Sequence, residues 1–232
     1  PNEPLIFSTG LFLMLFLGFS FIYMCLQNKL TARLLFVTAF SYYFYYKSSG
    51  FYFGLLALVT VSDYLLANLI HRHRQRKALG KLFVTLSLII DLGLLGYFKY
   101  TNFFVGMVER MLEHNFQPWD IFLPVGISFF TFQSLSYTID VYRGQLKPLP
   151  SLLDYAFYVS FFPQLVAGPI VRASDFAPQI RQPLTITRDM FARGLFCILI
   201  GLFKKAVISD YISLNFVDRI FDNPGLYSGL EN

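Results

Sequence analysis

The residue with the clearest chemical potential in this sequence is an acidic side chain inside an apolar run. Asp91 stands near the middle of the stretch Leu82–Phe98. A carboxylate within a membrane-spanning segment is costly, and it usually faces a partner or a cavity. Asp91 therefore either belongs to a functional site or forms a structural bond to a neighbouring helix, and the sequence leaves both interpretations open.

A second unusual stretch is Phe161–Arg172, which reads Phe-Phe-Pro-Gln-Leu-Val-Ala-Gly-Pro-Ile-Val-Arg. It is too apolar for a loop in water. Pro163 removes a backbone donor and disfavours helix in the residue before it, and Gly168-Pro169 repeats the break. Irregular backbone at hydrocarbon depth is tolerated only where protein or a water-filled cavity covers it. We therefore predict a proline-broken, re-entrant segment inside a helical bundle.

The other reactive residues form no recognisable catalytic or metal-binding constellation. His71 and His73 share a short basic loop without a third ligand nearby, and His114 stands in a polar stretch where we expect it to be solvated. Cys25 and Cys197 lie in apolar runs, and their number and spacing exclude a disulfide framework or a CxxC metal site. We predict no bound metal.

The amino-acid composition indicates the kind of fold that positions these residues. The chain has 232 residues, of which 55% are hydrophobic, 19% aromatic and 14% charged. Soluble domains average about 45–50% apolar and about 25% charged residues. The net charge of +5 comes from basic residues in short loops between apolar runs, so it indicates membrane topology and not a nucleic-acid partner. We predict an all-α, polytopic transmembrane helical bundle with the lipid bilayer as its surroundings.

The apolar runs predict the helices of this bundle, which we treat as a single membrane domain over residues 1–232. Ser41–Tyr46 resembles an interfacial aromatic belt at the end of a short span. A further helix should begin at about Thr187, whose hydroxyl can cap it. The apolar stretches expected to be helical are Leu5–Leu26, Leu34–Tyr46, Phe51–Ile70, Leu82–Phe98, Leu123–Val141, Leu152–Phe162 and the ten-residue half-span Gly194–Phe203.

The distribution of Lys and Arg predicts the orientation. The loop Arg72–Lys81 alone carries five of them, which marks the cytoplasmic side. An anionic-lipid-binding patch is a further interpretation of the same residues. Placing this loop inside, together with those after Leu26 and after Val141, collects nine basic residues against three on the other side. The N-terminus is then outside, and no cleavable signal is evident before Leu11.

Four ordered motifs resemble the membrane-bound O-acyltransferase family, and in particular its bacterial alginate O-acetyltransferase branch. The resemblance extends over nearly the whole chain. The motifs are Gly96-Tyr97-Phe98-Lys99-Tyr100-Thr101-Asn102-Phe103, the stretch from Leu123-Pro124-Val125-Gly126 through Ile139-Asp140-Val141-Tyr142-Arg143-Gly144, the segment Phe161–Arg172, and Gly201-Leu202-Phe203-Lys204-Lys205 with Asp210.

The resemblance implies an enzyme of the bacterial inner membrane that moves acetyl groups from a cytoplasmic thioester donor, such as acetyl-coenzyme A, to hydroxyls of an extracytoplasmic polysaccharide. A periplasmic acetyl-transfer protein is a further implied partner. No cofactor is expected to remain bound. In this family the catalytic residue is a histidine in a Trp-His-Gly-type motif, a group suited to act as a general base near neutral pH.

The sequence ends at Asn232 without such a motif, and none of its histidines matches one. We therefore assign no catalytic residue and expect the chain as given to be inactive alone. The residues that match form the wall of a substrate channel. Lys204 or Lys205 could attract the phosphates of coenzyme A, but ordinary snorkelling of interfacial lysines is the simpler interpretation. The predicted wall residues are Pro163, Gln164, Gly168, Pro169, Lys204, Lys205 and Asp91.

Two other functions compete with this one. Broken helices and intramembrane carboxylates also suit a transporter or a component of an export channel, but we find no internal repeat that would support it. A related family member that transfers D-alanyl groups to teichoic acid is the other alternative. The nature of the polymer is not determined by these residues.

Overall fold

The computed structural model describes residues 9–112, 119–165, 168–183 and 185–222, and every regular element within them is helical. His114 lies outside the described residues. The chain divides into two compact units, the first formed by residues 1–5 and 19–183 and the second by residues 6–18 and 184–232. Helix α1 (Gly10–Cys25) contributes its first part to the second unit and its last part to the first.

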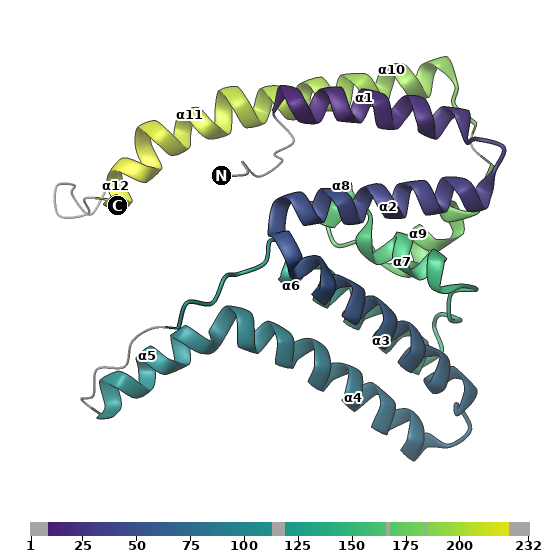
Figure 1. Ribbon diagram of the computed structural model, residues 1–232, viewed down its shortest axis with the longest axis vertical. Coiled ribbons are helices and arrows are strands. Elements are labelled where there is room, and N and C mark those ends of the chain that lie inside the picture. The colour runs from purple at the N-terminus through teal and green to yellow at the C-terminus, as the bar shows by residue number, and fades with distance from the viewer. Residues whose placement is uncertain (1–8, 113–118, 166–167, 184, 223–232) are drawn as a thin grey trace. The chain divides into compact units, whose positions relative to one another are not determined.

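The first unit contains most of the helices, and Figure 1 shows how they follow one another. Its elements are α2 (Leu30–Ser49), the short 3-10 turn η1 (Gly50–Tyr52), α3 (Phe53–Arg72), α4 (Lys77–Leu95), the π-helical segment η2 (Gly96–Tyr100), α5 (Thr101–Leu112), α6 (Ile127–Arg143), α7 (Leu152–Ser160), α8 (Phe162–Leu165) and α9 (Ala173–Ile180).

Helices α3, α4 and α6 form the centre of the first unit. Helices α3 and α4 run antiparallel after a tight turn, and α6 packs on both of them (Figure 1). Fully buried tyrosines fill the space between α6 and α7, where the rings of Tyr137 and Tyr155 have their centroids 4.6 Å apart. Helix α7 also packs on α2 and α3. The core is therefore rich in aromatic side chains that carry a hydroxyl group.

Helix α2 is longer than predicted at both ends, since it extends over Leu30–Ser49 and not over Leu34–Tyr46. It begins at Leu30 and so includes Arg33, which the sequence placed in a loop because it is charged. The guanidinium of Arg33 is buried because it donates to the carbonyl oxygens of Ile180 and Gln182 at 3.5 and 3.0 Å. Tyr45, expected in an interfacial belt, is fully buried. The interfacial prediction is wrong there because the other helices of the unit cover this side of α2.

Two other helix boundaries also differ from the prediction. Helix α4 continues through η2 into α5, so helical backbone extends past Phe98, the predicted end of this span. Helix α6 begins at Ile127 and not at Leu123. Gly126, immediately before it, has a φ angle of 73°, a left-handed conformation that suits glycine and stops the helix from extending backwards.

The basic loop and the end of α6 lie at the same end of the first unit. Gly144 follows α6 with a φ angle of 74°, and a Cβ atom there would clash with the guanidinium of Arg74. Gly80 lies against the ring of Tyr142 with more room, since a Cβ atom at Gly80 would lie 3.5 Å from that ring. Positive charge at a helix C-terminus is favourable. This placement agrees with assigning the basic loop and the loop after α6 to one side.

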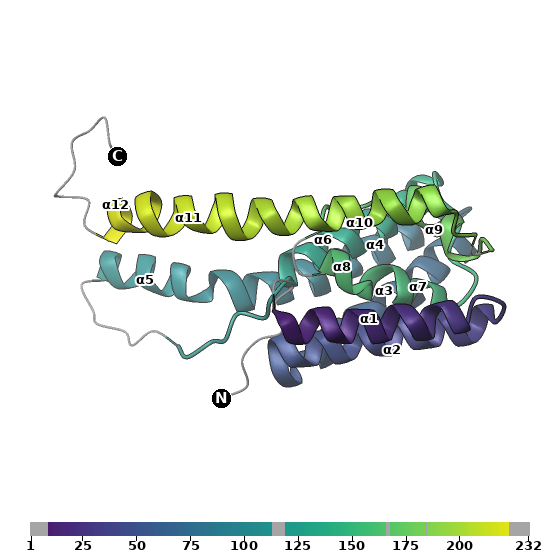
Figure 2. The ribbon, with the colours of Figure 1, turned by 90° about the horizontal axis from the view of Figure 1, so that it is seen from above.

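The second unit is dominated by one long helical rod. Its elements are α10 (Arg188–Phe203), η3 (Lys204–Ser209), α11 (Asp210–Ile212), η4 (Ser213–Val217) and α12 (Asp218–Asp222), and Figure 2 shows them following one another without a turn. The predicted cap is present, because the Thr187 hydroxyl accepts the backbone N–H of Met190 at 3.2 Å. The ten-residue half-span predicted over Gly194–Phe203 is part of this longer helical stretch, which continues past Lys204 and Lys205.

Within the residues that the structure describes, two continuous helical stretches are long and apolar enough to cross a membrane, namely Leu30–Arg72, which contains α2 and α3, and Lys77–Glu109. Helix α1 is apolar but shorter.

Candidate functional site

The helix expected over Leu152–Phe162 ends two residues early, and an interruption of helical backbone follows at the start of the Phe161–Arg172 stretch. Helix α7 ends at Ser160, Phe161 is extended with a ψ angle of 107°, and α8 begins at Phe162. Pro163 lies in the first turn of α8, where a missing backbone donor costs nothing. The N–H of Phe162 donates to the Ser41 hydroxyl at 3.2 Å. A side chain of α2 thus satisfies the backbone group that the break releases.

The backbone folds back tightly after α8. Gly168 donates its N–H to the carbonyl oxygen of Gln164 at 3.1 Å. A Cβ atom on Gly168 would overlap the Cα of Gln164 and would lie 2.9 Å from the carbonyl oxygen of Pro163. These neighbours are backbone atoms that cannot rotate away, so only glycine fits. Pro169, the next residue, is exposed.

Helix α6 contacts this break through a residue that the sequence analysis did not select. Gln133 is buried and donates from Nε2 to the carbonyl oxygen of Tyr158 at 2.9 Å and to Oε1 of Gln164 at 3.4 Å. An amide in the apolar stretch Leu123–Val141 was the signal available for finding it. Because Gln133 and Gln164 are 31 positions apart, only the packing of the helices could show that they meet.

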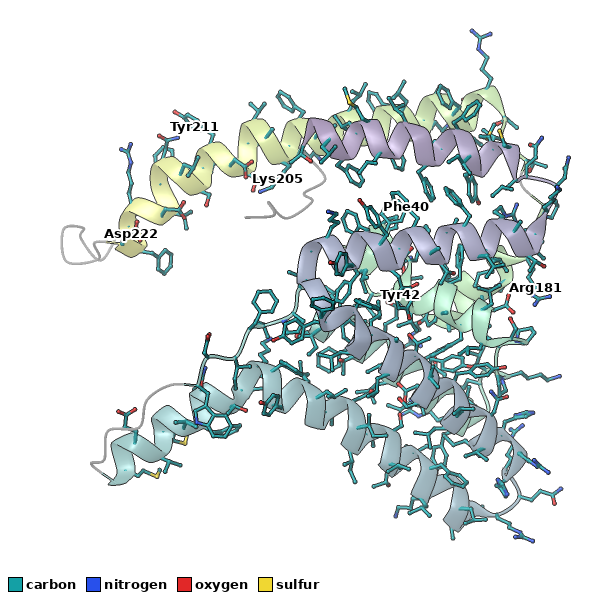
Figure 3. The ribbon with its side chains drawn as sticks, viewed as in Figure 1. Phe40, Tyr42, Arg181, Lys205, Tyr211 and Asp222 are labelled. Carbon is teal, nitrogen blue, oxygen red and sulfur yellow. The ribbon has the colours of Figure 1, made fainter. Side chains whose placement is uncertain are left out.

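The chain returns from the break to the end where α7 began. The Tyr158 hydroxyl donates to the carbonyl oxygen of Val171 at 2.9 Å. Arg181, just after α9, donates to both carboxylate oxygens of Asp154 in the first turn of α7, at 3.1 and 2.7 Å. Figure 3 labels Arg181 at this end of the unit. Helices α7 and α9 are therefore joined near the start of one and the end of the other.

Electrostatics favour the charged form of Asp154. Burial acts to raise its pKa, but the hydrogen bonds from Arg181 and Ser151, together with the positive charge of Arg181, outweigh burial and hold the pKa below its usual value. The same carboxylate raises the pKa of Arg181. The Asp154 side chain is 2% exposed, whereas that of Arg181 is 50% exposed, so water screens the pair on one side only.

Asp91, the predicted carboxylate of α4, faces a second carboxylate and not an open channel. It is fully buried beside Asp63 of α3. Asp63 accepts a hydrogen bond from the Ser87 hydroxyl at 2.7 Å and another from the Ser134 hydroxyl, which is itself 2.5 Å from the hydroxyl of Tyr155. Ser134 follows Gln133 in sequence, so α6 contacts both the break and the carboxyl pair.

Lys204 and Lys205, the remaining predicted wall residues, belong to the second unit and lie in η3. Both are exposed, and the ammonium of Lys205 is 2.5 Å from a carboxylate oxygen of Asp210 in the same helical rod (Figure 3). Two exposed lysines, of which Lys205 has a carboxylate partner, are compatible with an interfacial position and with an anion-binding position.

Two surface depressions lie away from the break and the carboxyl pair. One of about 240 Å³ is lined by Lys99 and the stretch Leu123–Phe129, so it joins two of the motifs that carried the family resemblance. The other, of about 260 Å³, is lined by Arg72, His73 and Arg76 with Gln75. Neither includes a predicted wall residue. Among the part of the chain that the structure describes, no three His, Cys, Asp or Glu residues gather as metal ligands.

Comparison with known proteins places the chain in a family. The model of the membrane-bound O-acyltransferase family matches residues 42–228. This covers most of the chain, which therefore belongs to the membrane-bound O-acyltransferase family.

The relatives carry more specific names. A probable alginate O-acetylase of Azotobacter vinelandii is 38% identical over 90% of this chain and 42% of its own length. A peptidoglycan O-acetyltransferase of Helicobacter pylori is 37% identical over 94% of this chain and 47% of its own length. A teichoic acid D-alanyltransferase of Bacillus subtilis is 26% identical over 49% of this chain and 30% of its own length. The chain thus spans less than half the length of these curated relatives. No solved structure matches it.

Proposed function

We propose that this chain is part of a multi-pass O-acetyltransferase of the bacterial inner membrane, with its N-terminus outside. The acetyl donor is a cytoplasmic thioester such as acetyl-coenzyme A, and the acceptor is an extracytoplasmic polysaccharide of the alginate type. The names of the relatives and the family support this activity. A periplasmic acetyl-transfer protein is the proposed partner that meets the enzyme on the acceptor side.

The observation that carries the proposal is the covered helix break between α7 and α8. Irregular backbone is compatible with a membrane interior only if other protein groups satisfy it. Here the Ser41 hydroxyl and the Gln133 amide, from α2 and α6, do so. We propose that residues 152–181 form a re-entrant segment, since Asp154 and Arg181 meet at one end. Such a segment shortens the distance between a donor on one side and an acceptor on the other.

The reaction itself is acyl transfer. An acceptor hydroxyl gives its proton to a general base while its oxygen attacks the thioester carbonyl carbon. The carbon–sulfur bond then breaks, and the thiolate leaves with a proton. His71 and His73 lie at the end of α3 in the basic loop, away from the break. We propose that the base lies outside residues 1–232 and that Pro163, Gln164, Gly168, Pro169 and Asp91 support the channel wall without taking part in proton transfer.

The acetylation test uses the break itself. Pro163→Ala combined with Pro169→Ala should let helical backbone extend, which would shift the wall by about 1.5 Å for each residue added. In the complete gene product we expect normal membrane abundance with loss of polymer-bound acetate. Pro150→Ala, an exposed proline before α7, is the matched control and should keep full acetylation. Full acetylation in the double variant at equal abundance would contradict a role of this segment in shaping the site.

The acceptor can be identified in the same assay. Loss of acetate from exopolysaccharide supports the proposed acceptor, whereas loss from peptidoglycan supports the acceptor named for the Helicobacter relative. The likeness to the D-alanyltransferase makes D-alanyl transfer to teichoic acid the second candidate. It would show as retained polysaccharide acetate with reduced esterified D-alanine.

The orientation is tested separately by thiol labelling on intact cells. Single cysteines at Ser48, near the end of α2, and at Gln75, in the basic loop, are introduced into a background without Cys25 and Cys197. An impermeant reagent should label position 48 and leave position 75 unlabelled until the membrane is permeabilised. The opposite pattern would reverse the proposed topology.

A further inference from the structure

Two carboxyl groups lie side by side in the interior of the first unit. Asp63 on α3 and Asp91 on α4 are both fully buried, and each influences the ionisation of the other. Ser87, one helical turn before Asp91 on α4, donates to Asp63 at 2.7 Å, which places this face of α4 against Asp63. The other ionisable groups that face them are the phenols of Tyr155 on α7 and Tyr137 on α6. Within the described residues, neither carboxyl group takes part in an ion pair.

The hydrogen bonds distinguish the two carboxyl groups. Ser87 and Ser134 each have a single hydroxyl proton, and both donate it to Asp63, one to each oxygen. Because Ser134 uses its proton in this way, its oxygen accepts the proton of the Tyr155 hydroxyl, 2.5 Å away. Asp63 therefore has donors at both oxygens, the arrangement that an ionised carboxylate requires.

Asp91 has the opposite surroundings. Both of its carboxyl oxygens are buried and meet no hydrogen-bond donor from the described part of the chain. Its polar neighbour is the carboxylate of Asp63, which has no proton to give. An ionised Asp91 would be a second buried negative charge without a donor or a cation, and two carboxylates that share a site cannot both ionise at ordinary cost. A protonated Asp91 becomes a donor and satisfies both residues at once.

We propose that Asp63 and Asp91 form a shared-proton carboxyl pair, with Asp63 ionised and Asp91 holding one proton that it donates to Asp63. The bound ligand is a proton. The single negative charge is then held by donors from α4 and α6, and Tyr155 extends the chain of hydrogen bonds to α7. The proton is a structural component that joins four helices. The inference does not depend on the proposed function.

A bound metal cation, such as sodium or calcium, is the alternative occupant of this site. The directions of the serine hydroxyl hydrogen bonds disfavour it. Hard cations such as calcium take about six to eight oxygen ligands whose lone pairs point at the ion. The hydroxyl protons of Ser87 and Ser134 point at Asp63. An ion between the carboxyl groups would compete with these bonds.

The test compares isosteric substitutions in the complete gene product, purified in detergent. In Asp91→Asn the amide NH₂ replaces the carboxylic proton as donor to Asp63, so the thermal unfolding midpoint should stay close to that of the wild type. In Asp63→Asn an NH₂ donor replaces one of the two oxygens that accept from Ser87 and Ser134, so one buried hydroxyl loses its acceptor and the midpoint should fall by about 5–10 °C. Asp175→Asn, at an exposed position in α9, controls for the substitution itself.

Infrared spectroscopy provides a readout that does not depend on how the Asp63 variant folds. The wild type at neutral pH should show the carbonyl stretch of a protonated carboxyl group buried from solvent, and Asp91→Asn should remove this band. Absence of the band from the wild type would overturn the proposal. So would equal destabilisation by Asp91→Asn and Asp63→Asn. Stabilisation by sodium chloride beyond that given by N-methylglucamine chloride at equal ionic strength would also overturn it, by showing that a cation occupies the site.

Discussion

The interior of the first unit and the helical rod α10–α12 both contain acidic residues in apolar surroundings, but they hold them in different ways. In the rod the partners are local and exposed: Asp189 pairs with Arg193 one turn away, with side chains 71% and 80% exposed. In the first unit Asp63 is bonded to Ser134, 71 positions away, and both are fully buried. A polar substitution should therefore be nearly neutral in the rod, whereas in the first unit it disturbs several helices at once.

The largest effect should come from replacing a glycine by alanine in the first unit. The same replacement in the rod serves as the comparison. Gly168→Ala places a methyl group against the Cα of Gln164, and because that neighbour is backbone the segment must move. Steric conflicts of this kind typically cost about 1–3 kcal/mol and occasionally more. Gly194→Ala, in α10, meets nothing within 4 Å and should slightly stabilise its helix. Thermal unfolding of the two variants checks the contrast, and equal midpoints would contradict the close approach at Gly168.

A smaller effect is expected from removing a single hydroxyl. The Tyr137 hydroxyl is buried and accepts the backbone N–H of Leu149 at 3.0 Å. Tyr137→Phe leaves that N–H unpaired, which costs about 1–3 kcal/mol. Tyr211→Phe, on exposed α11 (Figure 3), is the matched change in the rod and should be within about 0.5 kcal/mol of the wild type. Chemical denaturation measures both, and a stable Tyr137 variant would show that water replaces the lost acceptor.

The smallest effect concerns acid sensitivity. Because the folded state holds the pKa of Asp154 below its usual value, the pair with Arg181 stabilises the fold above the unfolded pKa of about 3.9. This contribution is lost as the pH falls through the lower, folded value. Asp154→Asn should therefore unfold more readily at neutral pH and lose part of the dependence on pH below about 4. Unfolding midpoints between neutral and acidic pH test this, and parallel curves for the variant and the wild type would contradict it.

Features that depend on neighbouring residues in the chain could be predicted from the amino-acid sequence. Proline and glycine predicted an interruption of helix in the Phe161–Arg172 stretch, because they act on the backbone at their own positions, and α7 does end at Ser160. The re-entrant path of the segment stays a prediction. The Thr187 cap was predictable for the same reason, since its partner is three residues away. The motifs sufficed to identify the membrane-bound O-acyltransferase family, which the comparison with known proteins confirmed. The roles predicted for the wall residues stay predictions.

Which polar side chains meet depends on how the helices pack against one another. Asp63 and Asp91 could each have been a satisfied structural residue or half of a site, and their contact depends on how α3 and α4 are rotated about their axes. The burial of Arg33 required the carbonyl groups of Ile180 and Gln182, and the role of Gln133 required Gln164. Helical periodicity predicts which residues share one face of a helix, but it does not predict which other helix packs against that face. Side-chain packing between helices sets that partner, since burying a polar group is tolerated only where a hydrogen bond compensates it.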